Sequence, residues 1–405
     1  MTVAPATHTD VRRSAILAQL GARGPVSRAD LARILRVSPA LVTQLIKGLI
    51  ADGLLQELNH SPSQGGRPAR LIGLVADAGQ SVGVKIAADH VTFVEAGIDG
   101  VVTRSATEPF DASAATSISN LSFLLHQFIA GGGERRILGI GVGVPGSVDQ
   151  QGEGTVTSSQ LGWNQVPIGR TLRQEFQLPV LVENNVNAVT MAEKLYGQGR
   201  GYDNLLVVTI GTGVGAGIVI DGSIARGFSG SAGEIGHIPV DENGPPCTCG
   251  NNGCLEAFVG ERALVKEGRL RGVLEGTSGI AELRAEADAG NPIAQSIFST
   301  AGHVLGRVLA GIVHTVDPQM VIILGEGVES WSHWSFGFEP SFRSSLMPHL
   351  RGVSVAVESW QDGSWAQGAA SLILATPFDA HGVAGEQGRL VRERLFEQSA
   401  LPESP

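Results

Sequence analysis

The chain has few cysteines and no long apolar run. Only three of its 405 residues are cysteine, and all three lie between positions 247 and 254. So small and crowded a set excludes a secreted disulfide framework and favours a local thiolate site. No stretch of about 18 apolar residues occurs, and residues 1–30 lack the apolar core of a signal peptide. We therefore expect a soluble, cytoplasmic protein with no membrane partner.

Glycine, by contrast, is abundant. The 55 glycines are about twice the usual share of ~7%, which favours tight turns and glycine-rich ligand loops. The absence of a Gly-X-Y period excludes collagen. The chain is long enough for two or three domains of about 150 residues each.

Charge is unevenly distributed along the chain. Residues 1–75 carry nine Lys and Arg against four Asp and Glu, a formal charge of +5 in a chain whose net charge is −10, which leaves −15 on the remainder. Phosphate backbones attract the first part and repel the second. This asymmetry favours an acidic body with a nucleic-acid-binding head. An ordinary basic surface would give the same charge count.

The first part predicts three short helices. Apolar residues recur at helical spacing over 11–21, and two further helices are expected over 28–35 and from 39 to about 52. Ser27 and Ser38 suit the N-caps of the second and third helices, and Asp30 suits a capping-box-like start. Two short helices joined by a tight turn are typical of a helix-turn-helix.

The third helix has a polar face suited to a major groove. Ala40, Thr43, Gln44 and Lys47 share this face by their spacing. Small, polar and cationic side chains are what a helix needs to read base edges. We take these four residues, with Ser38 at the helix start, as candidate DNA contacts. A solvated face with no role in binding would have the same pattern.

The next segment favours DNA binding. Two short strands, 54–58 and 69–74, flank a polar loop whose tip reads Gly-Gly-Arg-Pro at 65–68. This pattern predicts the hairpin wing of a winged helix. The guanidinium of Arg67 suits the narrow minor groove of A·T-rich DNA. We therefore expect a winged helix-turn-helix domain over residues 1–75.

Beyond residue 75, predicted strands alternate with predicted helices. Strands are expected over 81–86, 91–98, 137–144, 180–182, 205–210 and 215–220, and helices near 117–130 and over 187–196. The alternation predicts an α/β body that can be duplicated as two lobes. Periodicity alone does not distinguish an actin-like from a Rossmann-like topology.

Two motifs lie beside predicted strands of the body. The segment 211–217 reads Gly-Thr-Gly-Val-Gly-Ala-Gly, whose amides and hydroxyl suit a phosphate or a polyol, although a plain hairpin is equally compatible. Glu183, Asn184 and Asn185 follow a strand and open a helix, where ligand sites of α/β proteins gather. N-capping by Asn185 or Asn187 is the structural alternative.

The cysteines form the strongest motif. Cys247, Cys249 and Cys254 lie within eight residues, and His237 stands ten residues before the first of them. These four side chains suffice for a closed, tetrahedral Zn²⁺ site, which is structural because it has no open position. The alternative is three unmetallated thiols crowded in one loop.

By its sequence motifs, the chain resembles the ROK family of bacterial sugar kinases and sugar-responsive repressors. The matching motifs are Pro145-Gly-Ser-Val-Asp149, the glycine segment 211–217, Glu234-Ile-Gly-His237 and Cys247-x-Cys249-Gly-x-x-Gly-Cys254-x-Glu256. The resemblance covers about residues 80–375, and the winged helix resembles that of the regulator branch. The resemblance implies a two-lobed, actin-like (ribonuclease H-like) sugar kinase fold with a sugar in the cleft.

The resemblance also implies which residues hold the sugar. In the family these are the Asn-Asp pair, the Glu and His of the Glu-x-Gly-His motif and the Glu after the last cysteine; here they are Asn184, Asn185, Glu234, His237 and Glu256. Carboxylates accept paired hydrogen bonds from hydroxyls, and amides both donate and accept. His237 would then serve both the metal and the sugar.

Departures from the family kinases predict that this chain is not an enzyme. Asn185 replaces the aspartate that serves as general base, and an amide cannot take the proton. The phosphate loop Asp-x-Gly-Gly-Thr is replaced by Lys-Ile-Ala-Ala-Asp at 85–89. The asparagine that usually precedes Gly-Trp is absent, since Ser-Ser-Gln-Leu at 158–161 precedes Gly162 and Trp163.

We expect a transcriptional regulator, specifically a repressor, that senses a sugar. The expected division is a DNA-binding domain at 1–75, a first lobe at 76–190 and 362–380, a second lobe at 191–361 with the metal site, and a frayed tail at 381–405. The expected partners are a pseudo-palindromic operator with A·T-rich flanks, a sugar effector and further copies in a homodimer or homotetramer. The alternatives are a bifunctional sugar kinase with a DNA-binding head and a zinc-stabilised scaffold without a small ligand.

Overall fold

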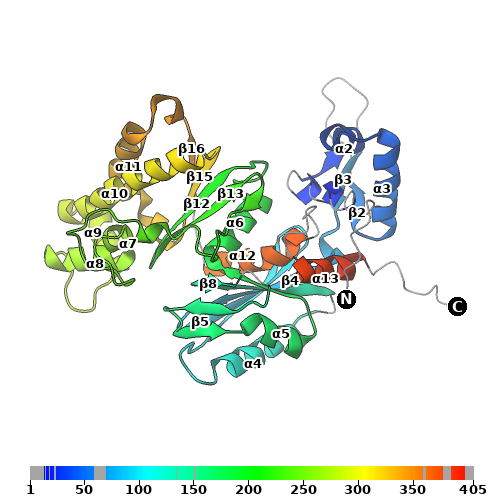
Figure 1. Cartoon of the computed structure of the whole chain (residues 1–405), viewed down its shortest axis with the longest axis horizontal. Helices are drawn as coiled ribbons and strands as arrows, with labels where there is room; N and C mark the ends of the chain where they lie inside the picture. Colours follow the sequence, from blue (N-terminus) through cyan, green and yellow to red (C-terminus); the bar gives the residue numbers. More distant parts are fainter. Residues whose placement is uncertain are drawn as a thin grey trace. The chain divides into compact units, whose positions relative to one another are not determined.

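The computed structural model describes residues 13, 15–17, 19–21, 24–58, 70–133, 135–149, 152–358, 362–376 and 385–396. The chain forms two compact units, Met1–Gly201 with Asp362–Pro405 and Tyr202–Gln361. The first unit holds the N-terminal head and the first of the two large sheets of the body (Figure 1). The division of the chain into four segments stays a prediction.

Two serines begin the helices of the helix-turn-helix, as expected. α2 spans Arg28–Leu35 and α3 spans Pro39–Ala51, and the hydroxyls of Ser27 and Ser38 accept hydrogen bonds from the first turns. The Asp30 carboxylate accepts a hydrogen bond from the Ser27 hydroxyl at 2.7 Å. The described residues of the predicted first helix are helical.

The wing strands are present, together with a strand that the sequence pattern did not predict. The head contains β1 (Val26–Ser27), β2 (Leu55–Leu58) and β3 (Leu71–Leu74), in the order β1-β3-β2. The missed strand β1 is only two residues long, which is too short to show alternation. Residues 59–69, and with them Arg67, lie outside the described residues.

The sheet of the first lobe has the strand order β11-β7-β4-β5-β6. Its strands are β4 (Gln80–Ile86), β5 (His90–Gly97), β6 (Val102–Pro109), β7 (Ile137–Val144) and β11 (Val180–Asn184). A small separate sheet consists of β8 (Ser147–Val148), β9 (Val156–Ser158) and β10 (Trp163–Val166). Strand β6 was not predicted because most of its residues are exposed and polar.

Helices cover both faces of this sheet (Figure 1). α4 (Ser117–Ala130) and α5 (Ile168–Phe176) lie on one face, and α12 (Asp362–Ala375) and α6 (Asn185–Leu195) on the other. α12 lies directly on the strands at two glycines. An added Cβ would lie 2.0 Å from the Ala366 carbonyl oxygen at Gly83 and 1.8 Å from that of Ala369 at Gly141. Only glycine allows this backbone approach.

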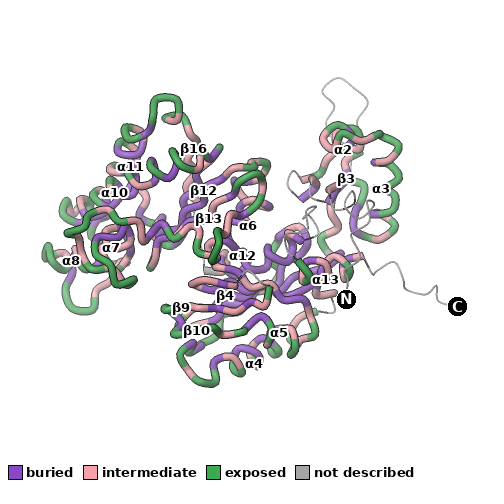
Figure 2. Tube along the Cα trace, viewed as in Figure 1, coloured by how far each residue is buried: buried purple, intermediate pink, exposed green. Residues whose placement is uncertain are grey.

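The second unit repeats the same topology. Its sheet has the order β14-β13-β12-β15-β16. The strands are β12 (Leu205–Ile210), β13 (Val214–Ile220), β14 (Ser223–Ile224), β15 (Met320–Leu324) and β16 (Ser354–Val357). In each sheet the first three strands pair antiparallel and the last two join in parallel on the other side of the first. The body is therefore a duplicated α/β fold, and its central strands are buried (Figure 2).

In the described part of the second unit, four α-helices lie between β14 and β15 in the sequence, and a fifth lies between β15 and β16. They are α7 (Glu256–Val259), α8 (Glu261–Leu270), α9 (Ile280–Asp288), α10 (Pro292–Val316) and α11 (Trp331–Ser345). Short 3₁₀ turns lie at Ala76–Ala78 in the first unit and at Ile235–His237 (η2), Glu326–Ser330 (η3) and Pro348–Leu350 in the second.

α10 is long and apolar enough to span a membrane. Its most apolar window has a mean hydropathy of 1.4, and 56% of that window is buried. α2 and α3 pass the same test only if they form one span bent by 116°. Because α10 packs along α11, it serves as the core helix of the second unit.

The expectation of a frayed tail is wrong for residues 385–396. These residues form α13 (Gly385–Phe396), whose Val391 and Leu395 are buried. The core around α13 also contains Ile16 and Leu17 of the head and Leu138 of β7. The head and the first lobe therefore share one core. The sequence pattern is compatible with a helix over 389–396, but it does not predict the packing of α13, because the few apolar residues of this polar segment find a partner only in the folded protein.

We predict that removing the Leu395 side chain destabilises the first unit. Leu395→Ala should lower the free energy of unfolding by about 2 to 5 kcal/mol, because the side chain is buried and its loss leaves a cavity. Glu393→Ala, on the exposed side of the same helix, should change it by no more than about 0.5 kcal/mol. Urea unfolding of both variants checks this, and equal effects would contradict the packing of α13.

Candidate functional site

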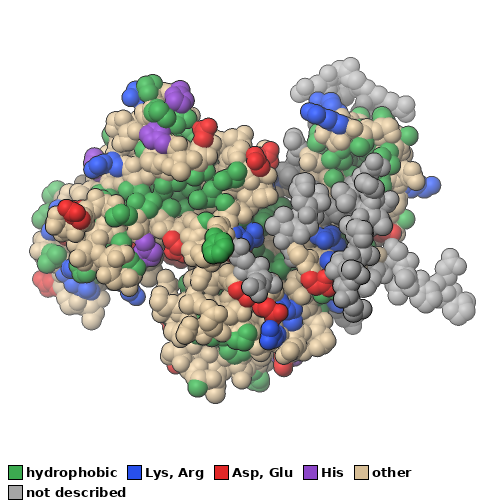
Figure 3. Space-filling model, in the orientation of Figure 1, with side chains coloured by type: hydrophobic (Ala, Val, Ile, Leu, Met, Phe, Trp, Pro, Cys, Tyr) green, Lys and Arg blue, Asp and Glu red, His purple; other side chains and the backbone are tan. Residues whose placement is uncertain are grey.

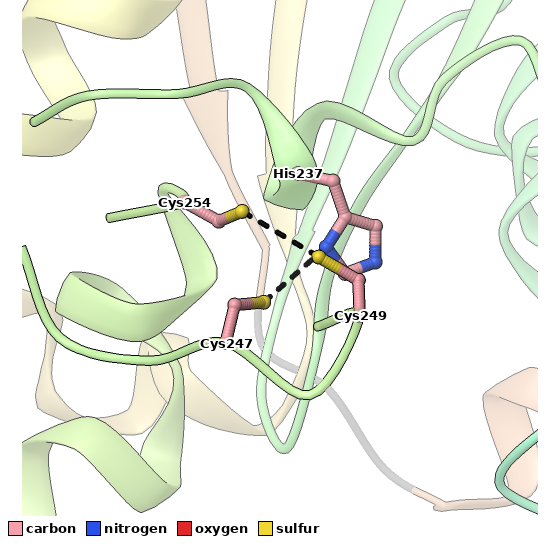
Figure 4. Close-up of side chains that lie close together, drawn as sticks. All are labelled: His237, Cys247, Cys249 and Cys254. Atoms are coloured by element: carbon pink, nitrogen blue, oxygen red, sulfur yellow. Dashed lines mark hydrogen bonds between the residues drawn. The ribbon is translucent and has the colours of Figure 1, made fainter. Parts of the chain in front are cut away.

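Three cysteines and one histidine of the second unit lie together (Figure 4). The ligand atoms of His237, Cys247, Cys249 and Cys254 all lie within 4.8 Å of one another. Nδ1 of His237 is 3.5 Å from Sγ of Cys247, and the Sγ atoms of Cys249 and Cys254 are 3.7 Å apart. Zn–S bonds of about 2.3 Å in a tetrahedron would place two sulfurs ~3.8 Å apart. The four atoms therefore have the spacing of a closed tetrahedral metal site.

Backbone hydrogen bonds fold the cysteine loop onto the histidine turn. His237 ends η2, and Cys254 forms an isolated β-bridge with Pro239. The backbone N–H of Cys247 donates to the carbonyl of Asn251 at 2.8 Å, which closes the loop between the cysteines. The ligands that are ten or more residues apart in sequence are thus held by main-chain contacts.

The thiols differ in acidity. Burial raises the pKa of Cys254 to about 12, whereas a hydrogen bond from the Asn251 backbone lowers the pKa of the exposed Cys249. A cation must therefore displace a proton from Cys254 when it binds. Because protons compete with the metal for the thiolates, metal affinity should fall as the pH falls.

Glu256 connects the cysteine loop to the hairpin of β12 and β13. One carboxylate oxygen, Oε2, accepts the backbone N–H of Val214 at 3.1 Å, and the other accepts the hydroxyl of Thr248 at 3.4 Å. An added Cβ on Gly236 would lie 3.4 Å from Oε2, so this carboxylate also lies beside the turn between Glu234 and His237. The three predicted effector residues of the second unit thus belong to one contiguous region.

The glycine segment 211–217 forms a plain hairpin, one of the two alternatives that its pattern allows. β12 and β13 pair antiparallel, and the backbone N–H of Gly211 donates to the carbonyl of Gly213 at 3.0 Å. An added Cβ on Gly211 would lie 2.3 Å from Oε2 of Glu326. A carboxylate therefore lies against the turn.

Asn184 caps α6, whereas the structural alternative named Asn185 or Asn187. β11 runs to Asn184, two residues further than predicted. The side-chain oxygen of Asn184 accepts hydrogen bonds from the backbone N–H groups of Val186 and Asn187, and the side-chain amide of Asn184 donates to the carbonyl of Gly146 at 2.9 Å. Asn185 is the first residue of α6, and both asparagines are partly buried. They stand at the carboxyl end of a parallel strand in the first unit.

The predicted DNA face of α3 is exposed. Ser38, Ala40, Thr43, Gln44 and Lys47 all lie in solvent, while Val42, Ile46 and Leu49 face the core. The Thr43 hydroxyl donates to the Pro39 carbonyl at 2.8 Å. Figure 3 shows Lys and Arg side chains on the surface of the head.

Comparison with known proteins agrees with this architecture. Residues 82–376 match the ROK family. The chain belongs to the ROK family. Residues 9–65 of this ROK protein match the MarR family, in agreement with the winged helix.

Similar proteins include both regulators and kinases. The chain is 28% identical to the xylose repressor of Bacillus subtilis (strain 168) over 79% of this chain and 83% of that protein. A solved ROK family transcriptional regulator, a homologue of the E. coli MLC protein, covers 96% of this chain and 99% of its own, with 24% identity and a TM-score of 0.79. A ROK family glucokinase from Streptomyces griseus, solved with glucose and AMPPNP, covers 73% of this chain and 99% of its own (27% identity, TM-score 0.64).

These findings confirm the predicted fold class, a winged helix-turn-helix followed by a two-lobed, actin-like kinase fold. The sequence pattern also led to every residue of the Cys₃His cluster. Sequence reasoning missed the hydrogen bond between Glu256 and Val214, which no local pattern could have indicated because 42 residues separate the partners.

We predict that the cluster binds one divalent cation per chain. Cys249→Ser should lose the metal and lower the melting temperature, because the remaining ligands no longer close a tetrahedron. Thr248→Ser, which keeps a hydroxyl between the same two cysteines, should retain the metal. Elemental analysis of both variants checks this, and acidification should release the metal from the parent. A parent protein that folds without bound metal would contradict the prediction.

Proposed function

We propose that this ROK protein is a cytoplasmic, sugar-responsive transcriptional repressor of sugar-metabolism genes. The observation that carries the proposal is the joining, in one chain, of a winged helix with an exposed polar face on α3 and a complete ROK body. The similarity to the xylose repressor extends over most of both chains. A pentose such as xylose is therefore the first effector to test.

The proposed effector residues are Asn184 and Asn185 of the first unit and Glu234, His237 and Glu256 of the second unit. Nδ1 of His237 faces Cys247, so its Nε2 is the nitrogen left for a sugar hydroxyl. Glu234 is exposed and Glu256 partly so, and each carboxylate can accept hydrogen bonds from neighbouring hydroxyls.

We propose Zn²⁺ as the metal, in a structural role. Three thiolates and one imidazole are a ligand set typical of closed zinc sites. When bound, the ion would hold the cysteine loop, whose Thr248 hydroxyl donates to Glu256, and Glu256 in turn accepts the Val214 N–H of the hairpin. Removing the metal should therefore weaken the response to sugar.

We further propose that the protein has no sugar kinase activity. Asn185 is an amide and cannot serve as general base. The loop that replaces the kinase phosphate loop ends in Asp89, whose pKa is lowered by its hydrogen bond to His90, so it is anionic and repels phosphate. The Glu326 carboxylate, which lies against the glycine turn, would also repel phosphate. ATP turnover across a sugar panel would instead support a bifunctional kinase.

Operator binding would require more than one copy of the chain. A single recognition helix reads a short half-site, so we propose a homodimer or homotetramer on a pseudo-palindromic operator. Arg67 would read A·T-rich flanks through the minor groove. Analytical ultracentrifugation with and without operator DNA tests the oligomeric state.

We predict that two substitutions on α3 affect DNA binding differently. Gln44→Ala should change the base preference at one operator position, at a cost of about 1 to 3 kcal/mol for the preferred base. Lys47→Ala should weaken binding to all sequences and reduce the salt slope by about 1 if Lys47 contacts a phosphate. Gln174→Ala, an exposed glutamine on α5, is the control. Unchanged binding by both α3 variants would remove this face from the DNA interface.

We predict that Glu256→Gln separates DNA binding from sensing. The amide can still accept the Val214 N–H but lacks the charge that favours sugar hydroxyls. The parent should lose operator affinity about 5- to 150-fold with effector, and the variant should lose much less. Glu261→Gln, at the start of the next helix, should respond as the parent does. Titrations of operator with and without xylose and a panel of monosaccharides measure this, and a parental response in the variant would remove Glu256 from the site.

A further inference from the structure

The loop before Glu234 carries a fully exposed phenylalanine. Phe228 is the most exposed large hydrophobic side chain among the described residues, at 101% relative exposure against 75% for Phe336. An isolated exposed apolar residue is common on protein surfaces. What distinguishes Phe228 is the anchoring of its loop.

Backbone contacts fix both ends of this loop on one strand. The N–H of Ala225 donates to the carbonyl of Ile218, and the N–H of Ala216 donates to the carbonyl of Gly233, both at 2.8 Å. The N–H of Ala232 closes the loop on the carbonyl of Arg226 at 3.1 Å. These three hydrogen bonds leave residues 227–231 as the short tip of the loop.

Gly233 sets the position of the loop relative to Glu234. Its φ is +95°, and an added Cβ would lie 1.8 Å from the Ala216 carbonyl oxygen. A larger residue would push the loop away from β13. The tip that carries Phe228 is therefore joined, through one tightly packed glycine, to the exposed carboxylate of Glu234.

The same end of β13 also holds Glu256. Val214, two residues before Ala216, donates its N–H to the Glu256 carboxylate. The Phe228 loop and two proposed effector residues are thus attached to the five-residue stretch Val214–Ile218 of one strand. This attachment favours a ligand of the effector site as the partner of the aromatic ring.

The surroundings of Phe228 favour a sugar over a protein partner. Its neighbours in the tip are Gly227, Ser229, Gly230 and Ser231. A hot spot in a protein interface needs surrounding contacts that exclude water. The glycine and serine side chains beside Phe228 are too small to provide them. A sugar ring has one apolar C–H face and a rim of hydroxyls, which an aromatic ring and nearby polar groups together satisfy.

We propose that Phe228 packs against the apolar C–H face of the sugar effector and contributes to sugar specificity. The proposal rests on the proposed function, because it needs a sugar at Glu234, His237 and Glu256. In this arrangement the carboxylates accept hydrogen bonds from the hydroxyl rim while Phe228 covers the ring face. A monosaccharide with several axial hydroxyls on that face should bind less well.

Sugar affinity of Phe228 variants tests this inference. The probes are D-xylose, D-glucose and a panel of further aldoses, titrated calorimetrically against the full-length protein. Phe228→Ala should weaken binding of the sugar that acts on the parent by roughly tenfold or more, with operator affinity in the absence of sugar unchanged. Phe336→Ala, which removes another exposed phenylalanine of the same unit, should bind as the parent does.

A tryptophan at the position gives an independent readout. Phe228→Trp should keep most of the affinity, and its added fluorescence should shift to shorter wavelength when the sugar covers the ring. If sugar still releases the parent from operator but Phe228→Ala binds it with parental affinity, this inference is wrong and the proposed function stands. If no sugar of the panel binds the parent or alters its operator affinity, both are wrong.

Discussion

The core shared by the head and the first lobe constrains how this protein can respond to a ligand. Leu395 of α13 packs in one cluster with Leu17 of the head and Leu138 of β7. The Arg394 side chain donates to the carbonyl of Ile137 at the start of β7, and the Arg13 guanidinium lies over the Phe396 ring. A head that shares buried apolar surface with a lobe cannot swing independently without exposing that surface to water. The recognition helix therefore follows the first lobe.

This shared core limits how a ligand can alter the DNA affinity of the protein. A ligand alters DNA affinity only through different binding to two states of the protein. Because the head shares its core with the first lobe, a ligand that changes the position of that lobe would also change the position of α3, and with it the fit of two heads to two operator half-sites.

Glu256 has a central position in the second unit. Its carboxylate contacts the hairpin at Val214 and the cysteine loop at Thr248, so the metal cluster and the predicted sugar ligands share a support. Residues that orient the ligands of a metal site often matter nearly as much as the ligands themselves. The departures from the kinase motifs lie elsewhere, at Asn185 and in the loop that ends at Asp89.

The sequence by itself determined the features that depend on local pattern. Caps at Ser27 and Ser38, the exposed polar face of α3, and the Cys₃His set are all readable over short windows, because capping, helical spacing and ligand spacing act between near neighbours. The tertiary structure alone decided the antiparallel and parallel order of the two sheets, the approach of α12 to Gly83 and Gly141, the packing of α13 and the contact of Glu256 with Val214. Each of these joins residues that are far apart in sequence or surfaces without a periodic pattern. Their pairing depends on the apolar area and backbone groups that only the folded chain brings together.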